Sequence, residues 1–427
     1  MAVREVQNQF TSSEIQIKNE KEEEIIISEV QLKKVLNRHL ELLITHFENS
    51  KVLFMPFTME TLKHFVTYVQ TDDPGLTCIT RAFDLYHLSI RYELENLRLK
   101  CRSFIIQQIN VNTVCSIHDF ARMIGDLDIT YYCWRAFDVF GQRLFTTVDF
   151  MSCKIATIDR LVSRGIYESV SELRLLQAVY QWSEEEVKRN LGADKFYSMN
   201  EESSRNAIRN VTEPFIGKIR FLAMNEHELQ FCVYTLNLLT GQEKSHIWHA
   251  FKTGDYSFYP SYFSRETNIR SSIYYCNLFS YINFGALSTV TKGEMKGYKF
   301  FSTEVVVRED CYVKALRFPV KLCKPIPMFV YAYINSLENG HFLFDTVCHP
   351  EGIADLETKL YLEKHWSIRL LAVFILAENV QPYVAFVPYL SFFVSGEGTD
   401  ARKFEDKLLT VDRYLMDNIY FAVDLYF

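Results

Sequence analysis

The 427-residue sequence has few of the features that mark membrane, secreted and metal-binding proteins. No C-x-x-C pair occurs among its 10 cysteines, which excludes zinc-ribbon and thioredoxin-type spacing. No apolar run approaches the ~18 residues of a membrane-spanning helix. The N-terminal region is polar and acidic at residues 18–24 and has no apolar signal-peptide core. We therefore expect a cytoplasmic protein, with the nucleus as an alternative, that has reduced thiols and no membrane partner.

Sequence motifs of enzyme chemistry are also missing. The nucleotide loops G-x-x-x-x-G-K-[ST] and G-x-G-x-x-G and the G-x-S-x-G elbow do not occur. His246 and His249 form an H-x-x-H pair, but no third metal ligand lies nearby in the sequence. Cys348 and His349 are adjacent, and neighbours on an extended chain point to opposite faces. The sequence thus predicts no enzyme, no cofactor and no metal site.

Charge and composition narrow the class further. The net charge of −7 argues against a nucleic-acid partner, because such binding needs a basic face. Only 15 glycines occur, too few for Kelch repeats with their glycine pairs at a period of about 50 residues. What the chain does have is 48% hydrophobic residues, with 34 Phe and 25 Tyr. This composition favours several cores with a β-rich portion, and the length predicts two to four domains at about 100–200 residues each.

The N-terminal part alternates strand and helix patterns after a disordered lead at 1–12. Strands are expected at 14–18, 25–30 and 52–55, and helices from Leu32 and over 59–69. Beyond the turn at 71–75, one long helix is predicted from a single apolar face spaced by three and four residues. That face consists of Phe83, Tyr86, Ile90, Leu94, Leu97 and Cys101.

Residues 109–225 read as all-helical. Asn112 is expected to cap a helix, and Ser169 and Glu172 have the spacing of a capping box. The helix after them carries an apolar face of Leu175, Leu176, Val179 and Trp182.

The C-terminal part changes to period two after a linker expected at 241–265. Residues 304–320, 327–334, 341–347 and 366–376 are strand-like and separated by Pro, Gly and Asn. Several strands with short turns predict a β-sandwich over 266–397, followed by a separate C-terminal segment at 398–427.

Two segments resemble the BTB/POZ domain. Residues 35–47 (VLNRHLELLITHF) align without a gap on the BTB pattern V-L-x-x-x-S-x-Y-F-x-x-M-F, and residues 52–70 resemble its strand–helix pattern. Three further segments resemble the BACK domain: INVNTVCSIHDFAR (109–122), SELRLLQAVYQW (171–182) and IRFLAMNEHEL (219–229). The strand pattern around 304–320 resembles a PHR-type sandwich. The resemblance implies an α+β multidomain chain with an α/β BTB domain at 13–108, an all-α BACK domain at 109–240 and a C-terminal antiparallel β-sandwich.

The resemblance implies a function in protein interaction. BTB–BACK proteins form homodimers and often recruit a target to a cullin-3 ubiquitin ligase, so the expected partners are a second copy, cullin-3 and a target held by the C-terminal domain. In the family the helix that carries Leu32, Val35, Leu36 and Leu40 lies at the dimer interface. Core packing within one chain is the alternative explanation for this stripe.

One departure from the family pattern concerns cullin binding. Cullin-binding members carry about ten or more residues, including a helix with a hydrophobic-x-Glu motif, before the second BTB strand–helix segment. Here only Glu48–Lys51 separate Phe47 from Val52. The alternative function is therefore a dimeric scaffold or transcription-associated BTB protein that does not bind cullin.

Overall fold

The computed structural model divides the chain into two units, Met1–Thr113 and Val114–Phe427. The predicted boundary between the first two domains lay five residues earlier, at 108. The structure describes residues 14–35, 52–165, 167, 170–234, 238–270, 275–278, 297–307, 310–318, 320–321, 324–334, 341–363, 366–376, 385–386, 409–411 and 422–426.

The first unit contains a three-stranded sheet in the order β2-β1-β3. β1 (Glu14–Lys18) pairs antiparallel with β2 (Glu24–Ser28) and parallel with β3 (Val52–Phe54), which confirms the three predicted strands. The turn between β1 and β2 forms because the Asn19 side chain accepts hydrogen bonds from the amides of Lys21 (3.0 Å) and Glu23 (2.9 Å). Alternate residues of β1 are buried, as expected for a strand with one face on a core.

The helices of this unit are α1 (Glu29–Val35), α3 (Met59–Thr71), α4 (Ile79–Arg91) and α5 (Glu95–Gln107). The single long helix predicted from Phe83 to Cys101 is wrong, because the chain turns at Tyr92–Leu94. Glu93 has a left-handed φ of 54°, and the Leu94 amide bonds back to the Ser89 carbonyl at 2.8 Å. Tyr86, Leu94, Leu97 and Cys101 of the predicted face are buried. Ile90 is 41% exposed and Phe83 is partly exposed, because α4 buries Ala82, Leu85 and Leu88 instead.

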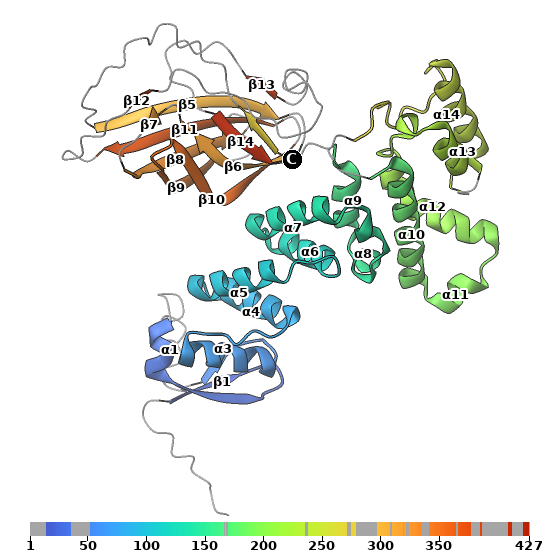
Figure 1. Cartoon of the computed structure of the whole chain (residues 1–427). Helices are drawn as coiled ribbons and strands as arrows, with labels where there is room; N and C mark the ends of the chain where they lie inside the picture. The colour runs from blue at the N-terminus through green and yellow to red at the C-terminus, as the bar shows by residue number, and fades with distance from the viewer. Residues whose placement is uncertain are drawn as a thin grey trace, which may run out of the picture. The chain divides into compact units, whose positions relative to one another are not determined.

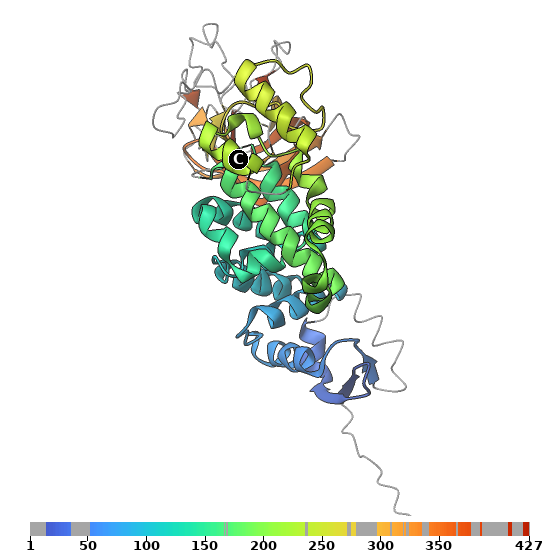
Figure 2. The ribbon, with the colours of Figure 1, turned by 90° about the vertical axis from the view of Figure 1, so that its right-hand side faces the viewer.

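The second unit begins with a helical array, drawn in green in Figures 1 and 2. Its helices are α6 (Val114–Ile124), α7 (Leu127–Phe140), α8 (Val148–Ser152), α9 (Ile155–Ser163), α10 (Glu172–Leu191), α11 (Ala193–Ser198), α12 (Glu201–Ile216), α13 (Glu226–Tyr234) and α14 (Gly241–Thr253), with short 3₁₀ turns at Gly141–Thr146 and Phe221–Ala223. The predicted face of α10 is confirmed, since Leu175, Leu176, Val179 and Trp182 are all buried.

Two predictions about helix ends and connections are corrected. Helix α10 is capped by Ser171, whose side chain accepts from the Arg174 amide, and Ser169 lies outside the described residues. Asn112 does not cap α6 by a described side-chain bond; it lies in the turn before it, where its amide donates to Asn110. The linker expected at 241–265 is largely a helix, α14, because a full capping box at Thr240 and Glu243 starts it.

Two antiparallel sheets follow, with strand orders β10-β6-β14-β4 and β13-β5-β11-β8-β9, and a short pair β12-β7. Figure 1 shows them in one body. Their strands are β4 (Tyr275–Leu278), β5 (Gly297–Val307), β6 (Cys311–Arg317), β7 (Val320–Lys321), β8 (Ile326–Ile334), β9 (His341–Cys348), β10 (Ile353–Leu362), β11 (Ser367–Leu376), β12 (Ala385–Phe386), β13 (Leu409–Val411) and β14 (Ala422–Tyr426).

The C-terminal segment is not separate from these sheets. β14 lies between β6 and β4, and β13 pairs with β5, so the sheets extend past the predicted limit at 397. β10 was not predicted, because its sequence carries Asp355, Glu357 and Lys359 among its apolar residues.

Candidate functional site

The predicted dimer stripe is only partly described. Leu32 is fully buried within the single chain, where α1 packs against the sheet and α3. This burial favours core packing at this position, and the assignment of the stripe to a dimer interface stays a prediction. The Val35 side chain, Leu36 and Leu40 lie outside the described residues, as do Glu48–Lys51 of the expected cullin-contact region.

The pairs considered for metal or thiol chemistry are placed apart from further ligands. Among the described residues, no three His, Cys, Asp or Glu side chains converge on a metal-sized space. His249 lies 3.5 Å from the Asp255 carboxylate, while His246 lies beside the Phe258 ring. Burial raises the pKa of the Cys348 thiol to about 12, which opposes formation of a nucleophilic thiolate.

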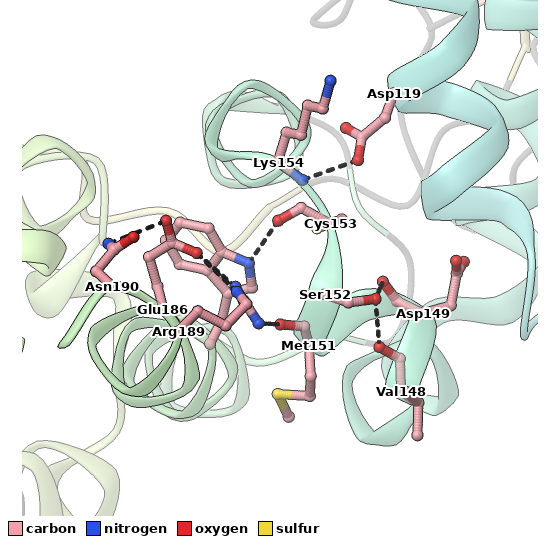
Figure 3. Close-up of polar contacts among 11 residues, drawn as sticks. Asp119, Val148, Asp149, Met151, Ser152, Cys153, Lys154, Glu186, Arg189 and Asn190 are labelled. Carbon is pink, nitrogen blue, oxygen red and sulfur yellow. Dashed lines mark hydrogen bonds and ion pairs between the residues drawn. The ribbon is translucent and has the colours of Figure 1, made fainter. Parts of the chain in front are cut away.

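Two half-buried carboxylates of the helical array serve as helix caps. Asp149 of α8 accepts from the amides of Cys115 (2.7 Å) and Ser116 (3.1 Å) at the start of α6. Asp119 of α6 accepts from the Lys154 amide at 2.8 Å, at the start of α9 (Figure 3). Burial raises the pKa of both carboxyl groups, and these hydrogen bonds oppose that rise. Both carboxylates thus accept hydrogen bonds from the backbone at helix N-termini, where the helix macrodipole also favours a negative charge.

Helix α10 fixes the segment between α8 and α9 from the other side. The Trp182 indole N–H donates to the Cys153 carbonyl at 3.0 Å, and Arg189 donates to the Met151 carbonyl at 2.5 Å (Figure 3). Glu186 accepts two bonds from the same Arg189 guanidinium, which holds it in place. Asp119 and Trp182, which lie in two of the segments that resemble the BACK domain, therefore help to fix the connection between α8 and α9.

An aromatic cluster joins the helical array to the C-terminal sheets; we term it the helix–sheet joint. It consists of Tyr131 and Trp134 of α7, Tyr312 of β6 and Tyr361 of β10. The first three side chains are at most 2% exposed, and the Tyr312 ring lies 5.3 Å from Tyr131 and 5.9 Å from Trp134, edge to face. Each buried ring contributes about 1.5–3 kcal/mol through removal from water, with about 0.5–1.5 kcal/mol more for a favourable ring pair.

Two arginines lie beside the helix–sheet joint, and each forms an ion pair with an aspartate. Arg160 donates to Asp310 at 2.8 Å and lies over the Tyr361 ring at 4.4 Å. Arg164, 1% exposed at its side chain, pairs with Asp138 at 2.5 Å and lies 4.3 Å from the Trp134 ring.

A second contact fixes α7 to the sheet at the backbone level. The Lys359 amide donates to the Asp128 carboxylate at 3.1 Å, at a point where β10 shifts register against β6. The helices and the sheets thus meet through packed rings, ion pairs and a backbone hydrogen bond.

The sequence prediction missed the joint. Helical periodicity marked the buried face of α7 but not what packs against it. One signal was available in β6, where Cys311, Tyr312 and Val313 are buried in succession. A strand that does not alternate is covered on both faces, and here the second cover is α7.

Among the exposed apolar side chains of this unit, two sets lie close together in the sequence. One set lies after α14, with Phe258 64% and Tyr262 55% exposed. The other lies along β9, at Phe342, Leu343 and Val347. No helix in the described part of the chain is long and apolar enough to cross a bilayer.

Comparison with known proteins adds no assignment. No protein-family model matches this chain, and no curated protein matches it. The resemblance to BTB and BACK domains is therefore carried by the five segments quoted above.

Proposed function

We propose that this chain is a non-enzymatic adaptor that brings proteins together. In this proposal a BTB-type N-terminal unit pairs two copies, BACK-type helices form a spacer, and the C-terminal sheets hold a target. The observation that carries it is the helix–sheet joint, because a binding module on a spacer works best when their relative orientation is fixed. The family role is recruitment of the target to a cullin-3 ubiquitin ligase, which raises the target's effective concentration near the ligase.

The use of the buried and half-buried polar groups supports a non-enzymatic protein over an enzyme. Asp119, Asp149 and Arg164 are each committed to a helix end or an ion pair. Glu172 is 4% exposed and binds Arg270 at 2.7 Å, which ties the segment after α14 back to α10. An enzyme instead needs such groups turned toward a shared space that can admit a substrate.

A dimeric scaffold or transcription-associated protein without cullin binding is the second candidate. The four-residue connection at 48–51 favours it, because the family's cullin-contact helix has no room there. Both candidates place the protein in the cytoplasm or the nucleus.

Light scattering of the full-length chain tests the adaptor proposal. We expect a mass near twice the 50.2 kDa of one chain. Leu36→Asp with Leu40→Asp should give a folded monomer, whereas Leu32→Asp should unfold the first unit because Leu32 lies in its core. A monomeric wild-type protein at micromolar concentration contradicts the proposal.

Calorimetry with the cullin-3 N-terminal region separates the two candidates. We expect micromolar or weaker binding, since a missing central anchor commonly costs a hundredfold or more in affinity. Replacing residues 48–51 with a longer segment that contains a hydrophobic-x-Glu turn should strengthen binding. A nanomolar complex with the natural sequence would establish the ligase-adaptor role instead.

A further inference from the structure

Strand β9 forms one edge of the five-stranded sheet. It pairs with β8 over eight residue pairs, from Cys348 opposite Ile326 to His341 opposite Tyr333, without a register shift. Among the described strands, none forms a ladder along its other side, although β10 lies beside it near the turn, where the Thr346 hydroxyl donates to the Asp355 carbonyl (2.6 Å). A straight edge of this length presents a row of backbone N–H and C=O groups that can accept a further strand.

The side chains of β9 do little to block such pairing. Phe342 is 39%, Leu343 55% and Val347 40% exposed, and the Phe342 ring stacks on Phe344 with centroids 6.2 Å apart. Natural edges are usually protected by lysine, proline or a bulge, and β9 contains none of these. Its one carboxylate, Asp345, is exposed between Leu343 and Val347 on the same face of the strand.

The neighbouring edge strand shows that the sheets can protect an edge. β10 follows β9 through a tight turn, in which the His349 amide bonds to the Ile353 carbonyl at 2.8 Å. β10 has a register shift between Asp355 and Leu360, and α7 contacts it at that shift. β9 has neither feature.

We propose that β9 binds an extended segment of a partner protein as an added strand. In the partner segment, the residues opposite Leu343 and Val347 are apolar, and the residue opposite Asp345 is Lys or Arg. Because residues opposite one face alternate along a strand, the partner carries the pattern apolar-x-basic-x-apolar. The added strand gains affinity from main-chain hydrogen bonds and specificity from these three side chains. This inference rests on the proposed function, in which the C-terminal sheets hold the target.

A display library of random 12-residue peptides, panned on the full-length chain, provides the probe. We expect the selected peptides to be enriched in apolar-x-basic-x-apolar. The affinity of one selected peptide is then measured by fluorescence anisotropy. Asp345→Lys should weaken binding about tenfold through loss of attraction and new repulsion, and a peptide with Glu at the basic position should bind this variant better than the natural chain.

Backbone changes in the peptide test the strand geometry itself. N-methylation of alternate amides should abolish binding in one register and leave it nearly unchanged in the other, because only every second amide of an added strand faces β9. Leu343→Lys in the protein should also weaken binding. The matched control is Val148→Lys, which alters an 84% exposed apolar side chain on α8.

Three outcomes would overturn the inference. Peptides that bind equally well to all β9 variants lie elsewhere on the chain, and the adaptor function then stands without this site. A change in oligomeric mass with Leu343→Lys makes a second copy the occupant of β9. If no peptide is enriched over an unrelated protein, β9 is not a peptide site, and the dimer and cullin measurements alone decide the adaptor function.

Discussion

Strands β9 and β10 are consecutive in the chain, and each lies at the edge of one of the two C-terminal sheets. The two edges differ in regularity and in what packs against them. β10 has a register shift and contacts α7 through the Lys359 amide and the Tyr361 ring, while Leu360 and Leu362, on the opposite face from Tyr361, are at most 1% exposed. β9 is straight and leaves Leu343 55% exposed. Covering one edge with aromatic rings and ion pairs stabilises the junction of helices and sheets. Leaving the other open costs a risk of aggregation, which a protein tolerates where the edge has a use.

The same substitution on the two edges gives the largest expected contrast. Leu360→Lys should destabilise the second unit by more than about 4 kcal/mol, because it places an unpaired charge in the core. Leu343→Lys should change the free energy of unfolding by no more than about 0.5 kcal/mol, since its side chain already faces water. Denaturant unfolding of both variants, followed by circular dichroism, measures the difference. Similar losses in the two variants would show that β9 is covered after all.

Local patterns in the sequence predicted an element well where its buried residues follow the period of a single helix or strand. Ile15 and Ile17 of β1 and Trp182 of α10 are buried as their spacing indicated. The prediction failed at Glu93, where two packed helices show the same apolar spacing as one long helix.

Whether a strand lies at the edge of a sheet could not be predicted from local patterns. β14 pairs with β6 more than 100 residues earlier in the chain. Whether a strand ends a sheet depends on such distant partners, which no local pattern records. The joint and the open edge at β9 are therefore visible only in the structure.

The ion pair behind the covered edge provides the second prediction. Arg164→Met should cost about 3–5 kcal/mol, because it removes the guanidinium that pairs with the buried Asp138 carboxylate at 2.5 Å. Adding Asp138→Leu should recover much of that loss, since two apolar side chains of similar size need no partner. The double-mutant cycle is measured by thermal and denaturant unfolding. Additive losses would mean that the pair is not coupled.

Acid should weaken the covered region through His118. This side chain is fully buried, and its ring Nδ1 lies 2.6 Å from the Thr157 hydroxyl. Burial, together with the nearby charges of Arg122, Arg160 and Arg164, lowers the pKa of His118 to about 3. An unfolded chain takes up the proton near pH 6.5 and the folded chain does not, so stability is complete above pH 6.5 and falls as the pH drops below it.

The free energy of unfolding should fall by about 2 kcal/mol between pH 7 and pH 5. This pH range lies above the ordinary pKa of carboxyl groups. His118→Asn should flatten this pH dependence whatever its effect on absolute stability. The control is His249→Asn, which changes an exposed histidine of α14. An unchanged slope in His118→Asn would assign the acid sensitivity to other groups.

The smallest effect is predicted at the start of α14, in the segment that the sequence predicts to be a linker. Like β10, this segment is held in place by specific contacts. The Thr240 hydroxyl accepts from the Glu243 amide (3.2 Å), and the Glu243 carboxylate accepts from the Thr240 amide (2.7 Å). Thr240→Ala should cost about 1 kcal/mol and raise the rate of proteolytic cleavage within 241–264 several-fold, because the start of α14 frays. Thr67→Ala is the matched control, since Thr67 is exposed within α3 and caps no helix end. Rapid cleavage of the natural chain at 241–264 would instead restore the linker, and with it a target-binding region that moves freely on its spacer.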